Sequence, residues 1–231
     1  MRRLAPDLWV AERSLRFGGA EIGARMTVVR VSDRRLFVHS PIPLSGALLA
    51  QISDLGTVSW IIAPNRFHHL SVCEWRDQFP GAHVLVAPGL EKKRPDFADA
   101  ITLGADSGLS SEGIETEVVQ GVPIANETVF FHRASATLII TDLAFNIGPE
   151  APWLTRVLFR LTGYYGRLGP TVFERLLVRD RAVFAQSLQR ILSWPFERVI
   201  VAHGTVKELG GREELVASYA WALKSSVTRA S

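Results

Sequence analysis

The chain has 231 residues, of which 47% are hydrophobic and 21% charged, which is enough to bury one large core and is unlike a disordered protein. The formal net charge is +3, with 26 Lys and Arg spread among 23 Asp and Glu. Nucleic-acid-binding proteins concentrate basic residues in a patch, and the one compact run here is Lys92-Lys93-Arg94, so the sequence argues against a nucleic-acid partner. The single cysteine, Cys73, excludes an internal disulfide.

The N-terminal segment MRRLAPDLWV carries two arginines but no apolar run of the length that a signal peptide needs. Nowhere do 18 uncharged apolar residues follow one another, as a transmembrane helix requires. We therefore expect a cytoplasmic protein without a transmembrane segment. The sequence does not indicate an oligomeric state.

The first half of the chain predicts an opening antiparallel meander, followed by alternating helices and strands. Leu44, Leu48, Leu49 and Ile52 recur at helical spacing, and Gly56 is suited to end that helix. In chain order, the expected elements are strands at 7–17, 25–32 and 35–40, a helix at 43–56, a strand at 58–64, a helix at 70–79, a strand at 82–88 and a polar loop at 89–100.

The second half predicts more strands and then mainly helices. The expected elements are strands at 114–120, 128–133 and 137–142, helices at 153–161 and 172–194, a strand at 198–202 and a helix at 213–223. A continuous βαβ alternation does not fit this order, whereas two packed sheets with helices outside do. Without an internal repeat or a linker, we expect one domain over residues 1–231.

Three apolar, strand-like runs end in residues that bind metals well. His68 and His69 follow the run at 58–64, Asp142 follows 137–141, and His203 follows 198–202. Buried strands of layered folds end on a common edge, so we expect these four side chains to converge. Imidazole and carboxylate together suit zinc, iron or manganese. For the other histidines, which lie within strand-like runs, a structural role is the preferred interpretation: His39, His83 and His132. At the end of the run at 35–40, however, His39 or Ser40 could reach a position beside the metal ligands.

These residues and the order of elements resemble the metallo-β-lactamase-like superfamily, whose fold is a four-layer αββα sandwich of the α+β class with its metal site on one edge. Its signature is a strand followed by His-x-His-x-Asp-His. The segment Asn65-Arg66-Phe67-His68-His69 resembles a degraded, Asn-x-x-His-His version of that signature. Asp142, in IITD, resembles the metal-bridging aspartate, and His203, in VIVAHG, resembles the last ligand.

The departures from the family pattern concern its first metal. Pro64 and Arg66 stand at the two earlier histidines of the signature, and the loop at 121–123 lacks the third histidine. The resemblance therefore implies one divalent ion, with zinc expected first and iron or manganese as alternatives, held by His68, His69, Asp142 and His203. The Arg66 guanidinium could replace the charge of the lost ion and grip an anionic substrate group, or it could simply face solvent.

The function that the resemblance implies is a metal-dependent hydrolase that uses one ion and a bound water. Its small-molecule substrate would be an ester, lactone, thioester or phosphoester with an anionic portion. Asp142 and His68 would be catalytic, and Arg66 and Asn65 would bind substrate. The alternative is a non-catalytic member of the fold that has lost its metal and binds a ligand or partner. The missing first-site histidines favour that alternative, whereas the metal-capable residues at all four second-site positions disfavour it.

Residues 152–180 combine an apolar helical stripe with several arginines. This segment is interpreted as a helical cap over the site, as a helix packed on the body of the protein, or as a helix that lies on a membrane surface. The stripe consists of Trp153, Leu154, Val157, Leu158 and Leu161.

Overall fold

The computed structural model describes residues 1–104 and 107–224. Its larger sheet has seven strands in the order β1-β2-β5-β6-β7-β8-β9. Neighbouring strands are antiparallel from β1 to β6 and parallel from β6 to β9. The strands are β1 (Arg2–Ala5), β2 (Leu8–Arg13), β5 (Ala24–Arg30), β6 (Arg35–His39), β7 (Thr57–Ala63), β8 (His83–Val86) and β9 (Ile101–Thr102).

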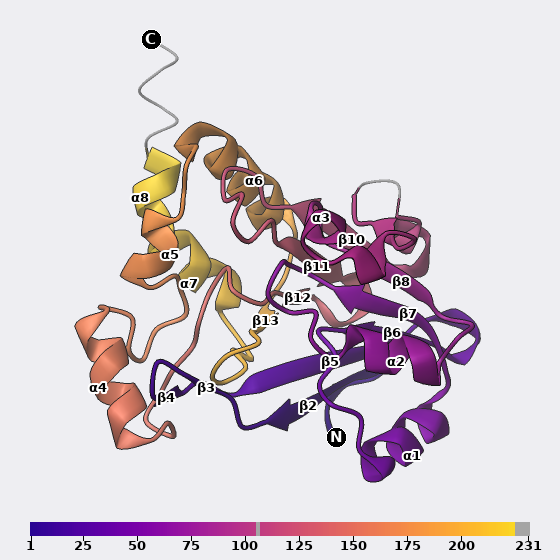
Figure 1. Ribbon diagram of the computed structural model, residues 1–231. Helices are drawn as coiled ribbons and strands as arrows, with labels where there is room; N and C mark the ends of the chain where they lie inside the picture. The colour runs from indigo at the N-terminus through magenta and orange to yellow at the C-terminus, as the bar shows by residue number, and fades with distance from the viewer. Residues whose placement is uncertain (105–106, 225–231) are drawn as a thin grey trace.

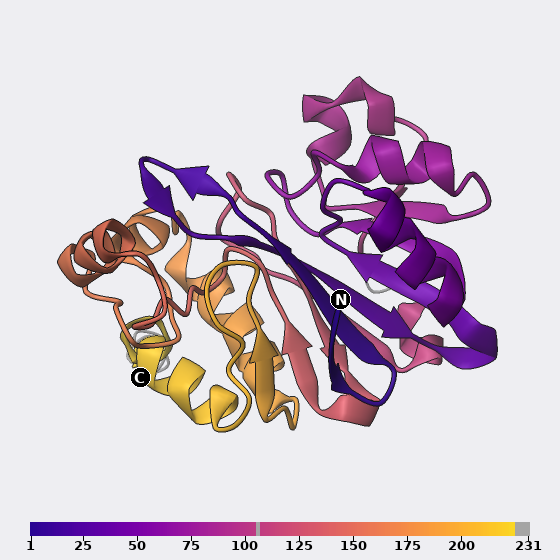
Figure 2. The same ribbon diagram turned by 90° about the horizontal axis from the view of Figure 1, so that it is seen from below.

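The second sheet has four strands, in which β12 and β13 are parallel and the other neighbours antiparallel. They are β10 (Ile114–Val118), β11 (Thr128–His132), β12 (Thr137–Ile139) and β13 (Arg198–Ile200). A separate hairpin of β3 (Arg16–Phe17) and β4 (Ala20–Glu21) projects from the far ends of β2 and β5 (Figures 1 and 2).

Successive side chains of a strand point to opposite faces of its sheet, so each sheet buries apolar side chains on both faces. The result is three hydrophobic cores: one between the two sheets, and one between each sheet and its outer helices. Val28 and Val38 face the helices outside the larger sheet, whereas their neighbours Val29 and Phe37 face the second sheet. The outer helices of the larger sheet are α1 (Gly46–Leu55), α2 (Val72–Gln78) and α3 (Leu90–Lys93). Those of the second sheet are α6 (Arg181–Ser193), α7 (Gly211–Ser218) and α8 (Ala220–Leu223). The predicted αββα sandwich is confirmed.

Two short helices, α4 (Trp153–Leu161) and α5 (Val172–Leu176), lie together with the β3–β4 hairpin at one end of the molecule (Figures 1 and 2). Across the described ranges, none of the helices combines the length and apolar character needed to cross a bilayer.

Local capping explains where the structure departs from the predicted elements. The helix expected at 172–194 starts where predicted, at the capping box of Thr171 and Glu174, but it is divided because α5 ends at Leu176 and Asp180 caps the start of α6. The expected loop at 89–100 contains the short helix α3. The strand expected at 137–142 ends at Ile139, and the next residues turn toward the edge of the sandwich.

His39, the last residue of β6, is a buried polar side chain between the sheets. Its ring lies against Phe37 and Phe130, and neither ring nitrogen has a hydrogen-bond partner. Burial, and secondarily the charge of His68, lowers the pKa of His39 from 6.5 to about 3. The preferred structural interpretation of His39 therefore agrees with its position in the core.

We expect the variant His39→Leu to be more stable than the parent, by roughly 1–3 kcal/mol near neutral pH, because it removes a buried polar group without a partner. Since the folded pKa is lowered, the unfolded chain takes up the proton first. His39 therefore reduces stability as pH falls from 6.5 toward 3, by an amount on the order of 4 kcal/mol.

Urea unfolding of metal-free protein at a series of pH values measures this difference. The gain from His39→Leu should grow as the pH is lowered. His83→Leu is the matched control, because His83 is exposed on β8. A gain that does not change with pH would contradict the assignment of His39 as a buried, neutral imidazole.

Candidate metal centre

Three metal-binding side chains meet at one edge of the sandwich. His68 lies in the turn after β7, Asp142 follows β12, and His203 follows β13. Because β12 and β13 are parallel and adjacent, their carboxyl ends lie at the same edge, and the end of β7 faces them from the other sheet. One ligand atom of each side chain lies within 4.8 Å of the others. The expected convergence is thus observed for these three residues.

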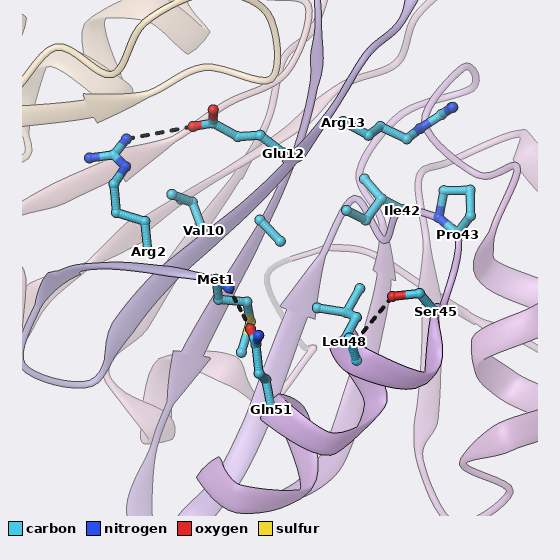
Figure 3. A pocket seen from close by; sticks show the side chains of 12 residues that line it. Met1, Arg2, Val10, Glu12, Arg13, Ile42, Pro43, Ser45, Leu48 and Gln51 are labelled. Carbon is cyan, nitrogen blue, oxygen red and sulfur yellow. Dashed lines mark hydrogen bonds and ion pairs between the residues drawn. The ribbon is translucent and has the colours of Figure 1, made fainter.

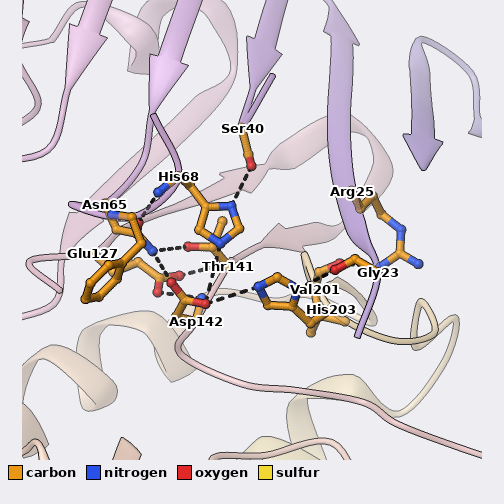
Figure 4. Close-up of polar contacts among 11 residues, drawn as sticks. Gly23, Arg25, Ser40, Asn65, His68, Glu127, Thr141, Asp142, Val201 and His203 are labelled. Atoms are coloured by element: carbon orange, nitrogen blue, oxygen red, sulfur yellow. Dashed lines mark hydrogen bonds and ion pairs between the residues drawn. The ribbon is translucent and has the colours of Figure 1, made fainter. Parts of the chain in front are cut away.

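Asp142 lies beside both imidazoles and contacts each of them (Figure 4). Its Oδ1 lies 3.3 Å from Nε2 of His203 and 3.5 Å from Nε2 of His68. The centroids of the two rings are 5.1 Å apart. The Asp142 side chain retains 20% exposure, whereas His203 retains 3%, so the cluster is accessible mainly from the Asp142 side.

Hydrogen bonds at the far nitrogen of each ring orient both histidines. Nδ1 of His203 lies 2.6 Å from the carbonyl oxygen of Gly23 and donates to it, so Nε2 of the neutral ring is left with a lone pair that can bind a metal ion. Nδ1 of His68 lies 2.8 Å from Oγ of Ser40. When His68 donates in that bond, its Nε2 also carries a lone pair toward Asp142. Ring nitrogens held in this way are the usual arrangement of metal-binding histidines.

Ser40 reaches His68 from the turn that follows β6. Its backbone has φ of 53°, in the left-handed region, and its N–H donates to the carbonyl of Ile62 at 3.1 Å. A serine in that conformation carries strain, which the neighbouring strand supports. The turn thus places the hydroxyl against the imidazole.

Asp142 is itself held by two buried side chains. Asn65 donates from Nδ2 to Asp142 Oδ2 at 2.6 Å and to Thr141 Oγ1 at 2.9 Å. Glu127 accepts the backbone N–H groups of Thr141 and Asp142 at 2.6 and 2.8 Å. The carboxylate of Asp142 therefore has little freedom to turn away from the histidines.

Burial alone would raise the pKa of Asp142. In the absence of a metal ion, the positive charge of protonated His68 and the hydrogen bonds that Nε2–H groups of protonated His68 and His203 donate to the carboxylate outweigh burial and lower that pKa below its usual range. Glu127 shows the opposite behaviour. Its burial, together with the negative charge of Asp142, raises the pKa of Glu127 to about 7. The cluster therefore keeps Asp142 ionised, as a metal ligand must be.

His69 does not join the cluster, although the sequence predicted it as a fourth ligand. Its ring stacks edge-on against Phe97, at 6.1 Å between centroids, and its Nδ1 lies 3.3 Å from Nη1 of Arg94. Burial, and then the charges of Lys93 and Arg94, lowers the pKa of His69 to about 4. The tight turn at 65–69 directs the two adjacent histidines to different neighbours, so the structure offers three ligands here.

Asn65 is also placed differently from the sequence prediction, which made it a substrate-binding residue. Its side chain is fully buried, and its Oδ1 accepts the backbone N–H groups of Phe67 and His68, each at 2.8 Å. Because its Nδ2 already serves Thr141 and Asp142, the amide is used within the protein. Asn65 is therefore a positioning residue for the turn and for Asp142.

Arg66 lies where the family pattern would have a first-metal histidine, and its Nη1 donates to the carbonyl of Pro123 at 3.1 Å. It thereby bridges to the loop at 121–123 that lacks the other first-site histidine. Lys93 donates to the Arg66 carbonyl at 2.7 Å, and its ammonium lies over the Phe67 ring. With Arg94 beside His69, three cations border this side of the site.

On the other side, aromatic side chains connect the site to α4. Phe145 stacks on His203 with 5.3 Å between ring centroids, and Phe159 of α4 packs on Phe145 at 5.7 Å. Thr155 of α4 is tied to the backbone of Glu21 in the hairpin. Helix α4 therefore borders the metal edge together with the hairpin.

Two hollows of the surface are not lined by the cluster residues. One of about 550 Å³ lies between β2 and the start of α1, and Val10, Ile42 and Leu48 line it together with polar residues (Figure 3). Another of about 370 Å³ includes Gly23 and Gly204 and adjoins the outer side of the His203 loop. Neither hollow is lined by His68, Asp142 or His203. The candidate metal site is therefore identified by the chemistry of its donor atoms and not by the volume of a pocket.

The three-residue cluster fits a single divalent ion. Two neutral imidazole nitrogens and one carboxylate oxygen are a donor set used by catalytic zinc, which keeps a further position open for water. Of the residues that orient the ligands, the sequence pointed to Ser40, as one of two residues at the end of the third strand that could reach the site, but it did not reveal Gly23 or Glu127. The only sequence signal for Glu127 is an acidic residue directly before the mostly apolar strand β11.

Comparisons with known proteins agree with this architecture. The family model of a domain of unknown function, DUF4336, matches residues 6–90. No curated protein sequence matches the chain. Among solved structures, the chain is similar to a metallo-β-lactamase from Pontibacter korlensis, with 13% identity, a TM-score of 0.63, and coverage of 98% of this chain and 97% of that one.

Two further structures give the same result. The mono-zinc form of the metallo-β-lactamase FIM-1 from Pseudomonas aeruginosa has 13% identity, a TM-score of 0.63, and coverage of 98% of this chain and 95% of that one. VMB-1 has 12% identity, a TM-score of 0.66, and coverage of 97% and 96%. Likeness over nearly the full length at such low identity establishes the architecture and leaves activity open. This chain has the metallo-β-lactamase-like fold.

Proposed function

We propose that this protein is a metal-dependent hydrolase that uses one divalent ion, zinc, held by His68, Asp142 and His203. The observation that carries the proposal is the convergence of three donor atoms within 4.8 Å, with the far nitrogen of each imidazole engaged elsewhere. Side chains oriented in this way are prepared to bind a cation without rearrangement.

When bound, a divalent zinc ion lowers the pKa of a coordinated water from about 15.7 toward about 7, so that hydroxide becomes available at neutral pH. The protein supplies the orientation. Glu127 and Asn65 fix the direction of the Asp142 carboxylate, and Gly23 and Ser40 fix the two rings. Phe145 covers one side of His203 and keeps bulk water from that ligand.

The charges around the site support a substrate with an anionic portion. Arg66, Lys93 and Arg94 border the histidine turn, and the Asp142 carboxylate is surrounded by the two imidazoles. A guanidinium or ammonium beside the cleft would hold a carboxylate or phosphate group of the substrate. We propose a small ester, lactone, thioester or phosphoester as the substrate, with residues 152–180 forming a wall or cap on the Phe145 side.

Purified protein is expected to contain about one zinc per chain by elemental analysis, because the cluster offers one complete donor set. Hydrolysis of an activated ester or phosphoester should require that metal and stop in a chelator. Asp142→Asn should lower both the zinc content and the rate by at least about 100-fold, since it removes a charged ligand. Asp77→Asn, on the exposed side of α2, is the matched control.

Zinc content and hydrolysis together distinguish a metal-dependent hydrolase from a non-catalytic member of the fold. Zinc at one equivalent with chelator-sensitive hydrolysis supports the hydrolase. Protein that binds no metal and hydrolyses none of the substrates would instead favour a non-catalytic member of the fold, in which Arg66 and its bond to Pro123 have replaced the first metal site.

A further inference from the structure

One end of the molecule exposes large apolar side chains. Helix α4, helix α5 and the β3–β4 hairpin lie at this end in both views (Figures 1 and 2). Leu154 of α4 also approaches Gly19 of the hairpin, within van der Waals distance of the position a Cβ would take there. We define the apolar end by the exposed side chains of Phe17, Trp153, Val157, Leu161, Phe173 and Leu176.

The apolar face of α4 points outward rather than into the protein. Trp153 is 69% exposed and Leu161 79%, whereas the inward side of the same helix is occupied by Thr155 and Phe159. A helix of a globular protein normally buries its apolar stripe against the core. In α4 the described residues do not cover this stripe, which stays exposed to solvent. A contiguous exposed apolar surface of this kind marks a site of interaction with a partner or a membrane.

The charges around the apolar end are predominantly positive. Residues 152–181 contain six arginines and two acidic residues. Both acids are already used, because Glu174 accepts the Thr171 N–H in the capping box and Asp180 caps α6. Arg160 of α4 and Arg167, in the segment between α4 and α5, are exposed, whereas Arg181 lies over the ring of Trp221 in α8. Among the residues that the structure describes, Arg160 and Arg167 form no ion pair with a carboxylate, so they leave uncompensated positive charge beside the apolar end.

We propose that the apolar end docks on an anionic lipid surface. An amphipathic element with Trp, Phe and Leu on its apolar face and arginines at its rim inserts shallowly among lipids, while the guanidinium groups meet anionic headgroups. A second copy of this chain fits less well, because a symmetric contact would bring the two arginine rims together. The surface adjoins the metal edge through Phe159 and Phe145, so docking would bring that edge close to the membrane.

The test is co-sedimentation of the full chain with vesicles of phosphatidylcholine alone and of equal parts phosphatidylcholine and phosphatidylglycerol. Binding is expected to the anionic vesicles only, and to weaken in about 0.5 M salt, which screens the arginines. The double variant Trp153→Ser/Leu161→Ser should bind at least about tenfold more weakly, because affinity follows the apolar area inserted. Both side chains are exposed, so its thermal midpoint should stay close to that of the parent.

Ile101→Ser is the matched control, because Ile101 is 46% exposed on β9, at the edge strand farthest from β1. It should bind as the parent does. The proposal is overturned if the parent ignores both kinds of vesicle, if the double variant binds undiminished, or if light scattering shows a dimer that the double variant abolishes. None of these readouts depends on hydrolytic activity, so the outcome is independent of the proposed function.

Discussion

His68→Ala is expected to lower the affinity for zinc by at least about 100-fold, whereas His69→Ala should leave that affinity unchanged. Loss of a hydrogen-bond partner behind a ligand already costs roughly 10–100-fold in metal affinity, so loss of a ligand should cost more. Only His68 directs a ring nitrogen toward Asp142 and His203; His69 contacts Phe97 and Arg94. Because the two substitutions affect adjacent residues, their comparison distinguishes a metal ligand, His68, from a histidine that only packs near the site, His69.

Calorimetric titration of chelator-treated protein with zinc measures both affinities. Thermal unfolding with and without zinc gives a second readout, since an ion that binds only the folded state raises its stability. His68→Ala should lose that zinc-dependent gain and His69→Ala should retain it. Equal losses in the two variants would show that His69 is a ligand after all and that the turn at 65–69 rearranges on binding.

Asn65→Ala is expected to destabilise metal-free protein by roughly 2–5 kcal/mol, because it leaves the partly buried N–H groups of Phe67 and His68 without acceptors and removes two bonds that the buried amide donates. The same change should weaken zinc binding by roughly 10–100-fold, since Asp142 loses the bond that directs it. The loss of folding stability reports on the turn at 65–69, and the loss of zinc affinity reports on the orientation of Asp142.

Urea unfolding in the presence of a chelator measures the first effect, and zinc titration below the unfolding transition measures the second. Asn146→Ala is the matched control, because its amide makes one exposed bond, to the Thr205 carbonyl at 2.7 Å. That variant should lose about 1 kcal/mol or less. If Asn65→Ala is no less stable than Asn146→Ala, the network described around Asn65 does not hold the turn.

The order of elements follows from local patterns that sequence displays. The periodicity of Leu48 and Ile52 predicts α1, and the run before Pro64 predicts β7, because helices and strands bury one face at a fixed spacing. Metal-binding residues at strand ends could be located in the same way, since parallel strands end at a common edge. The αββα architecture and the meeting of His68, Asp142 and His203 were accessible from sequence on those grounds.

Other features depend on contacts between segments far apart in the chain. Two contacts decide which of the adjacent histidines faces Asp142: one from Ser40, in the turn after β6, and one from the Asn65 amide within the tight turn at 65–69. The spacing of residues in the sequence carries no information on such directions. The carbonyl of Gly23 that orients His203 comes from a segment 180 residues away. The cap that Asp180 places at the start of α6 divides a helix that apolar periodicity alone made continuous.

Helix α4 shows the same division between local pattern and tertiary structure. Its amphipathic character is present in the spacing of Trp153, Val157 and Leu161. Sequence by itself determined that this helix has an apolar stripe, because side-chain periodicity is a local property. Only the tertiary structure decided that Phe159 and Thr155 take the inner side and that the stripe faces outward, because the packing of Phe145 and the hairpin sets the rotation of the helix.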